Sequence, residues 1–236
     1  MTFSMRRVFA IMHKDYKDVS RNLYVTTTVF TPLIMAVFLV QLGIGNIDSH
    51  YIIINTAFVL VATYVQSSLI AEEKEKKTLR GLMLSPASII EIFSGKSLLS
   101  LIATKVIIIL SMLLTGYNPK NAFIIAFALL LSIIFYIGVG TLMGLLTKSV
   151  MEASVAIIPA IGIIILGSFV TPFIEKYPIL AIAEYLPNLQ LIDMAKQVET
   201  GAGLAEVWPN LGIILLWSIA IYFLCVYLYK KSMVDE

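Results

Sequence analysis

Charged residues are scarce in this sequence. Only 14% of its 236 residues are Asp, Glu, Lys or Arg, whereas soluble domains carry about 25%. Apolar residues make up 59%, and the mean hydropathy is +0.91. The scarcity of charge excludes an ordinary soluble domain, and no nucleic-acid partner is expected. The apolar excess predicts an integral membrane protein whose main partner is the lipid bilayer.

Cysteine and histidine are also rare. Cys225 is the one cysteine, so no disulfide can form within the chain. His13 and His50 lie far apart in the sequence, which argues against a metal pair. The phosphate loop Gly-x-x-x-x-Gly-Lys-Ser/Thr does not occur, so the chain is not expected to hydrolyse ATP by itself. No bound metal, no cofactor and no catalytic residue are therefore expected.

Six apolar runs are long enough to cross a hydrocarbon core of about 30 Å. They cover residues 23–42, 51–70, 97–115, 122–146, 153–173 and 208–229. Pro32 predicts a kink in the first run. Six polar side chains in the second run predict that it faces neighbouring helices rather than lipid, and Gly140 and Gly144 in the fourth match the small-xxx-small pattern of close helix packing. The predicted fold class is an all-α integral membrane protein with six transmembrane helices.

Two segments outside these runs have patterns of their own. Residues 1–22 mix apolar and basic side chains, which predicts an amphipathic helix in the membrane interface; an ordinary soluble helix is the alternative. Residues 174–207 contain prolines, glycines and acidic residues. Short interfacial or re-entrant helices are expected there, over 177–186 and 189–198, because these stretches are too short to span. Both segments belong to a single domain, 1–236.

The basic residues predict the orientation of the chain. With the N-terminus inside, 13 of the 17 Lys and Arg residues fall on the inner side and three on the outer side, while Lys105 lies within a span. The positive-inside rule therefore favours both termini in the cytoplasm. It also places residues 71–91 in the cytoplasm and residues 174–207 on the extracellular side.

The polar stretch 71–91 stands out between apolar runs. Seven charges of both signs fall between Glu72 and Arg80, and Leu79, Leu82 and Met83 then recur at helical spacing. This pattern predicts a short amphipathic helix that docks in a groove of a soluble partner; a solvated connecting loop is the alternative. Residues 72–77 are expected to be more exposed than the apolar edge. The residues from Ser88 to Glu91 match a capping box that opens the next helix.

A family resemblance lies in Ala71-Glu-Glu-Lys-Glu-Lys-Lys-Thr-Leu-Arg-Gly-Leu-Met-Leu-Ser-Pro86, followed by Glu91 and Gly95-Lys96. These residues resemble the first cytoplasmic loop of ABC-2 type transporter permeases. Three positions, Lys77, Arg80 and Gly81, depart from the family pattern, which usually has Gly, Glu and Leu there. Elsewhere, residues 1–22 are similar to the family's elbow helix, 138–148 to its Gly-rich fourth span and 185–201 to its Leu-Pro segment.

The resemblance implies a permease subunit of an ATP-driven exporter in the plasma membrane. Such permeases pair as homodimers or as heterodimers with a related chain, and they bind two copies of a separate ABC ATPase that holds ATP and Mg. Family members export drugs, antimicrobial peptides, lipid-linked glycans, ions and haem, and here an apolar or amphipathic substrate moving outward is expected. Coupling to the partner is expected to depend on residues of the cytoplasmic loop, namely Glu73, Glu75, Thr78, Leu79, Leu82, Met83 and Pro86.

Lys105 is the clear ionisable residue within a span, which also keeps a secondary transporter or channel open as an alternative. An unpaired charge there costs about 2.5–3.5 kcal/mol, so Lys105 is expected to face a cavity, the protein interior or a polar neighbour. Gln66 is a candidate neighbour. The alternative is that the Lys105 amine snorkels to the membrane interface. An intramembrane enzyme or scaffold is a third reading, but the sequence shows no pairing of a nucleophile with a base.

Overall fold

The computed structural model describes residues 3–78, 81, 85, 87–170 and 177–235. The protein is 86% helical, and the described residues form no strand, which confirms the all-α class. The helices are α1 (Met5–Arg21), α2 (Leu23–Val29), α3 (Thr31–Gln41), α4 (Ile47–Ala57), η1 (Phe58–Thr63), α5 (Tyr64–Glu75), α7 (Ile89–Thr115), α8 (Ala122–Leu146), α9 (Val150–Val170), η3 (Pro178–Tyr185), α10 (Pro187–Thr200) and α11 (Leu204–Asp235).

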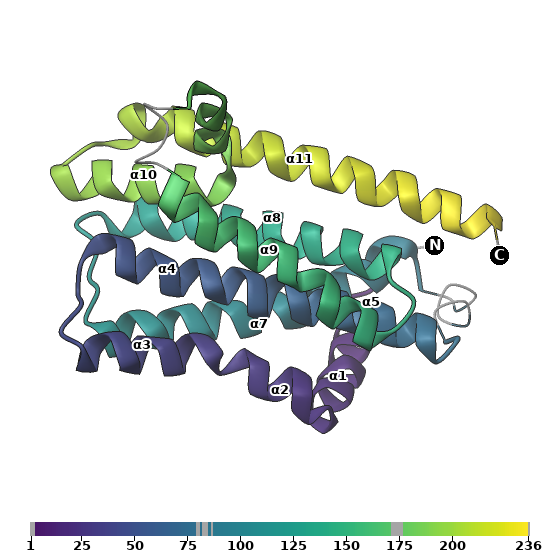
Figure 1. Cartoon of the computed structure of the whole chain (residues 1–236). Helices are drawn as coiled ribbons and strands as arrows, with labels where there is room; N and C mark the ends of the chain where they lie inside the picture. Colours follow the sequence, from purple (N-terminus) through teal and green to yellow (C-terminus); the bar gives the residue numbers. More distant parts are fainter. Residues whose placement is uncertain (1–2, 79–80, 82–84, 86, 171–176, 236) are drawn as a thin grey trace.

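The long helices run side by side, so the bundle has two distinct ends (Figure 1). At one end α1 crosses the bundle beside the last turn of α5 and the first turns of α7; we call this the charged end. The N- and C-termini both lie at the charged end, on the right of Figure 1. The other end, here called the opposite end, carries the α3–α4 and α7–α8 loops and α10.

Five helical segments of the described chain are long and apolar enough to cross a membrane. They are Leu23–Gln41, Ile47–Glu75, Ile90–Thr115, Ala122–Leu146 and Leu204–Tyr229. The predicted total of six spans is not confirmed, because the apolar stretch described in α9, Val150–Ile163, is shorter than a span. The kink predicted at Pro32 is confirmed, since the first segment breaks at Phe30 and Pro32 lies in the first turn of α3.

The continuous helix α4–η1–α5 forms the centre of the bundle. In its most apolar window 89% of the residues are buried, against 17% in the first segment and 22% in the last. Its π-helical turn, η1, lies against α7, α8 and α9. Five of the six polar side chains singled out in the predicted run 51–70 are buried: Asn55, Thr63, Gln66, Ser67 and Ser68. The expectation that these residues face other helices is therefore confirmed.

Glycines let α8 approach the central helix closely. A Cβ atom added at Gly140 would lie 2.4 Å from the Thr63 carbonyl oxygen, and one at Gly144 would lie 2.8 Å from the Ser67 carbonyl oxygen. Thr63 also donates a hydrogen bond to the Tyr136 carbonyl oxygen at 3.0 Å. The small-xxx-small pattern thus marks a real helix contact, because only glycine leaves room for the facing backbone.

The flanking segments are helical as predicted. The 1–22 segment forms α1, whose buried stripe consists of Val8, Ile11 and Asp15. The two short helices expected within 174–207 correspond to η3 and α10, and α10 packs on α11 and touches α4 and α8 at the opposite end.

We expect Gly140→Ala to destabilise the fold by about 1–3 kcal/mol, because overpacking forces the α5–α8 contact apart. The matched control is Gly212→Ala on α11, where an added Cβ has no atom within 4 Å. Alanine suits a helix better than glycine, so the control should be neutral or slightly stabilising. Thermal unfolding of the purified protein in detergent measures both. Equal melting temperatures for the two variants would contradict the close packing at Gly140.

Candidate functional site

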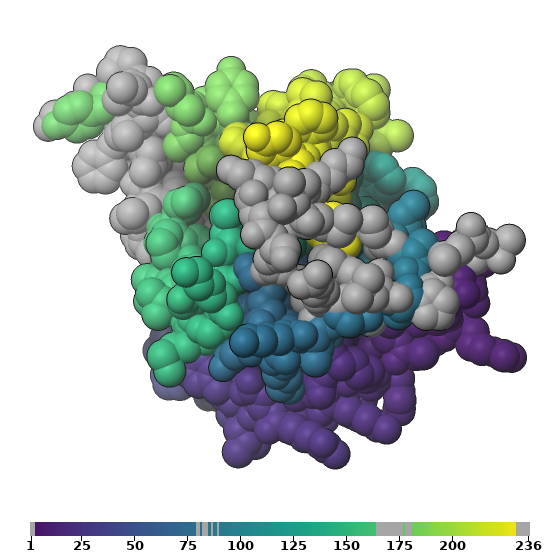
Figure 2. Space-filling view, turned by 90° about the vertical axis from the view of Figure 1, so that its right-hand side faces the viewer, coloured from purple at the N-terminus to yellow at the C-terminus, as the bar shows by residue number. Residues whose placement is uncertain are grey.

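The charged end contains the described part of the predicted coupling segment. Residues 71–78 end α5 and leave it, and 87–91 lead into α7. Of the residues expected to couple to a partner, the structure places Glu73, Glu75 and Thr78. Leu79, Leu82, Met83 and Pro86 lie outside the described residues. Figure 2 looks onto this end, where α1 (purple) forms the lower rim and α11 (yellow) lies at the top.

Glu73 lies in the last turn of α5 and is 3% exposed. Its carboxylate accepts hydrogen bonds from Lys14, from the Thr78 hydroxyl and, at 3.3 Å, from Lys96. The expectation of an exposed side chain is wrong for Glu73, because α1 and α7 cover it. Glu75, Lys76 and Lys77 are exposed as predicted, and Thr78 is exposed as well.

A buried ion cluster joins three helices around Lys96 of α7. The Lys96 ammonium, 1% exposed, lies 3.2 and 3.3 Å from the two carboxylate oxygens of Asp15 on α1 and 3.3 Å from Glu73. It also donates to the Leu69 carbonyl oxygen at 3.5 Å. Asp15 itself is fully buried. A buried charge is tolerated only when it is paired and hydrogen-bonded, so the three side chains hold α1, α5 and α7 in one arrangement.

Lys14 completes the charge balance of this cluster. It is half-exposed, pairs with Glu73, and lies 3.2 Å from Asp18 and 3.5 Å from Asp15. Burial alone would lower the pKa of Lys14, but the hydrogen bond and the negative charge of Glu73 raise it above its usual value. Burial raises the pKa of Asp15, and the charges of Lys96 and Lys14 oppose that rise. The buried carboxylates of Asp15 and Glu73 are thus set against the two ammonium groups, and Asp18 adds a third carboxylate beside Lys14.

A second set of bonds anchors the start of α7 to α1. Glu91, fully buried, accepts hydrogen bonds from Arg7 Nε at 3.0 Å and Nη2 at 2.7 Å and from the backbone N–H groups of Ser4 and Ser88. Ser88 accepts in turn from the Glu91 backbone N–H at 3.3 Å. The predicted capping box is therefore present, and the same glutamate also binds the N-terminal helix.

Gly95 explains why α1 can lie so close to α7. A Cβ atom added at Gly95 would lie 2.8 Å from Cβ of Ile11 and 3.0 Å from the Val8 carbonyl oxygen. The adjacent Lys96 reaches Asp15 one turn further along α1. Gly95 therefore permits the close contact between α1 and α7, and the ion pair of Lys96 with Asp15 stabilises it.

The end of α5 also binds the connection between α8 and α9. Lys74 donates to the Leu145 carbonyl oxygen at 2.6 Å, near the end of α8. The Glu75 carboxylate accepts from the Val150 backbone N–H at 3.0 Å, at the start of α9. A carboxylate at a helix N-terminus and an amine at a helix C-terminus both complement the helix dipole. The last turn of α5 thus contacts four helices through charged side chains.

The two intramembrane residues do not meet in the structure. The buried Gln66 amide donates to Thr141 at 3.1 Å and to Ser97 at 3.4 Å, and its oxygen accepts from Ser100 at 2.8 Å. Its hydrogen bonds are therefore made to α7 and α8. Lys105 is exposed and lines a pocket to which Gln66 does not contribute.

Sequence reasoning missed Arg7, Asp15 and Lys96 as site residues. A signal for Asp15 is present, because it follows Val8 and Ile11 at spacings of seven and four residues and so falls on the apolar face of α1. An acidic side chain on an apolar helix face requires a buried partner. Among the described residues, no group of three His, Cys, Asp or Glu side chains is arranged to hold a metal ion.

The chain belongs to the ABC-2 family of transporter proteins, whose family model matches residues 34–228. It is therefore a membrane-spanning permease subunit of an ABC transporter, a class that associates with an ABC ATPase subunit. A search of curated proteins finds no match.

We expect Lys96→Met to destabilise the protein by about 3–5 kcal/mol, because it leaves two buried carboxylates without their shared cation. Lys17→Met, at an exposed position of α1, is the matched control and should change little. Adding Asp15→Asn to Lys96→Met should restore part of the loss, and a double-mutant cycle in detergent unfolding experiments measures this coupling. Additive effects of the two changes would show that Asp15 and Lys96 do not interact.

Proposed function

We propose that this permease drives export by receiving movements of its ATPase through the segment 76–88 at the charged end. One observation carries the proposal. The chain on both sides of this segment is fixed by buried charged contacts, at Glu73 before it and at Glu91 after it, while Lys76, Lys77 and Thr78 are exposed. A segment that is held at both ends and begins with exposed residues is suited to docking on a soluble partner.

The ion cluster would transmit a movement of the docked segment to the helices around it. A displacement of the segment acts on the last turn of α5 and the first turn of α7. Both turns are joined to α1 by Lys96, Arg7 and their acidic partners. Breaking one buried pair costs several kcal/mol, so the joined helix ends move together rather than slide. The central helix α4–η1–α5 then transmits the movement through the membrane.

The charged end is proposed to face the cytoplasm of the cell, in the plasma membrane. The positive-inside rule supports this orientation, and the location of both termini at that end agrees with it. The proposed assembly has two permease chains, identical or related, and two ATPase subunits that bind ATP and Mg. The proposed cargo is an apolar or amphipathic molecule moved outward.

The orientation predicts opposite accessibility for two pairs of single cysteines. In a Cys225→Ser background, Gly45→Cys and Lys120→Cys at the opposite end should react with an impermeant maleimide added outside cells. Lys76→Cys and Lys148→Cys should react only after the membrane is opened. All four positions are exposed, so burial does not confound the result. Labelling of position 76 in intact cells would overturn the proposed orientation.

We expect Leu82→Asp to uncouple the permease from its ATPase. The apolar edge predicted for this segment contributes about 1.5–3 kcal/mol per fully buried side chain, so affinity should fall about 10–100-fold. Lys76→Ala should do far less, because Lys76 is exposed and pairs with Glu72 of its own helix at 2.5 Å.

The measurement is co-purification with the ATPase together with ATP hydrolysis by the complex in lipid. Both should fall together in Leu82→Asp, while the yield and monodispersity of the permease stay unchanged. Wild-type binding and hydrolysis in Leu82→Asp would favour a solvated connecting loop instead.

A further inference from the structure

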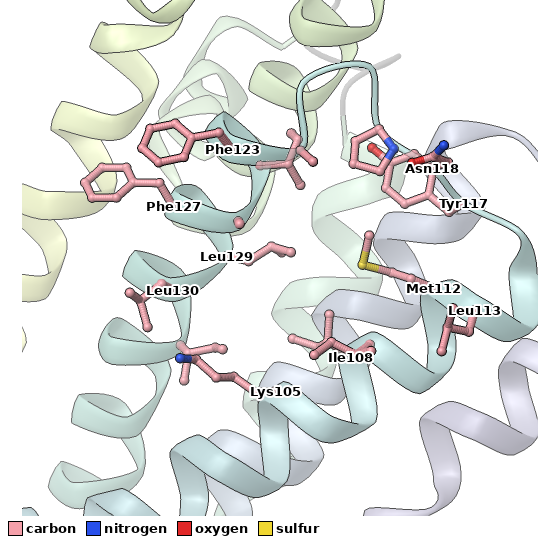
Figure 3. A pocket seen from close by; sticks show the side chains of 16 residues that line it. Lys105, Ile108, Met112, Leu113, Tyr117, Asn118, Phe123, Phe127, Leu129 and Leu130 are labelled. Carbon is pink, nitrogen blue, oxygen red and sulfur yellow. The ribbon is translucent and has the colours of Figure 1, made fainter.

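A pocket of about 680 Å³ lies between α7 and α8, away from the charged end. Its walls are apolar side chains such as Ile108, Met112 and Phe127, and its polar lining residues are Lys105, Tyr117 and Asn118. Figure 3 shows Lys105 extending from α7 towards α8, at the other end of the pocket from Tyr117 and Asn118. Ligand pockets typically enclose about 300–1,000 Å³ and combine apolar walls with a few polar groups.

Lys105 brings a positive charge deep into the membrane-spanning region. It lies ten residues before the end of α7 at Thr115 and sixteen after its start at Ile89, or about 15 and 24 Å along the helix. No ion pair joins Lys105 to any described residue. An ammonium group at this depth is costly without a negative partner. The Lys105 side chain in this pocket therefore requires an anion nearby.

The chain itself supplies no carboxylate at this depth. The sequence contains no Asp or Glu in 19–47, 49–71, 92–151, 153–174 or 207–234. These stretches contain the membrane-crossing portions of the apolar helices, so a second copy of the chain packed on this face would bring no acidic side chain to Lys105. Neither this chain nor a second copy of it therefore supplies the missing charge, and an anionic ligand would do so.

We propose that this pocket binds a long-chain carboxylate, with its acid group on the Lys105 amine and its hydrocarbon chain along the apolar walls of α7 and α8. One lysine balances one negative charge, which favours a monoanion over a headgroup with several charges. The inference rests on the function proposed above, because it names a ligand class for that permease.

The test is photolabelling of the purified full chain in neutral-lipid nanodiscs, without an ATPase, using a diazirine-bearing fatty acid. Mass spectrometry should locate the label on peptides from 105–133. The unlabelled acid should compete about 10–100-fold better than its methyl ester, since the ester lacks the charge-assisted hydrogen bond to Lys105.

Three variants separate the charge from the pocket. Lys105→Met should remove the preference for acid over ester, and Lys105→Arg should keep it. Ala126→Phe, which fills the pocket from α8, should abolish labelling of 105–133 in a chain that remains monodisperse. Equal competition by acid and ester in the wild type, an unchanged preference in Lys105→Met, or labelling elsewhere would overturn the inference.

The result is independent of ATPase coupling. Leu82→Asp should bind the acid as well as the wild type, because residue 82 lies in the coupling segment and not in the pocket. If Leu82→Asp keeps wild-type coupling while the wild-type chain binds the acid through Lys105, the proposed function alone is refuted. If Leu82→Asp uncouples the ATPase while the wild-type chain shows no Lys105-dependent preference for the acid, this inference alone is refuted.

Discussion

One buried ammonium group, that of Lys96, determines how the charged end is assembled. Its two carboxylate partners, Asp15 and Glu73, come from helices far apart in the sequence. None of the three side chains can return to water without separating α1, α5 and α7, and none can remain buried alone at acceptable cost. The position of α1 across the bundle, the end of α5 and the start of α7 therefore depend on one another.

This dependence changes the role of α1. An amphipathic helix that only rests on a membrane surface can shift along it, but α1 contributes Asp15 and Arg7 to buried contacts and packs on Gly95. It is thus part of the frame that holds the coupling segment. Movement of that segment must displace α1 as well, or else break a buried pair.

Hydropathy predicted most of the bundle because a helix that crosses lipid must be apolar over its whole length and must satisfy its backbone hydrogen bonds internally. The fourth span, 122–146, has the predicted bounds in the structure. The second was predicted as 51–70 but runs from Ile47 to Glu75, because neighbouring helices, rather than lipid, cover its polar end. The pairing of Asp15 with Lys96 was not predictable in the same way, since a list of charges does not say which side chains a tertiary contact removes from water.

Two lysines on α7 connect the ion cluster at the charged end with the pocket beside α8. Lys96 and Lys105 are nine residues apart, and at 100° per residue they point to opposite sides of the helix. Lys96 faces α1 and α5 and is neutralised within the chain, whereas Lys105 faces the pocket beside α8 and has no acidic neighbour in the sequence of that region. Because α7 is one continuous helix from Ile89 to Thr115, a shift imposed on Lys96 by the coupling segment also moves the wall that carries Lys105. The proposed coupling segment and the proposed ligand pocket are thereby joined through one continuous helix.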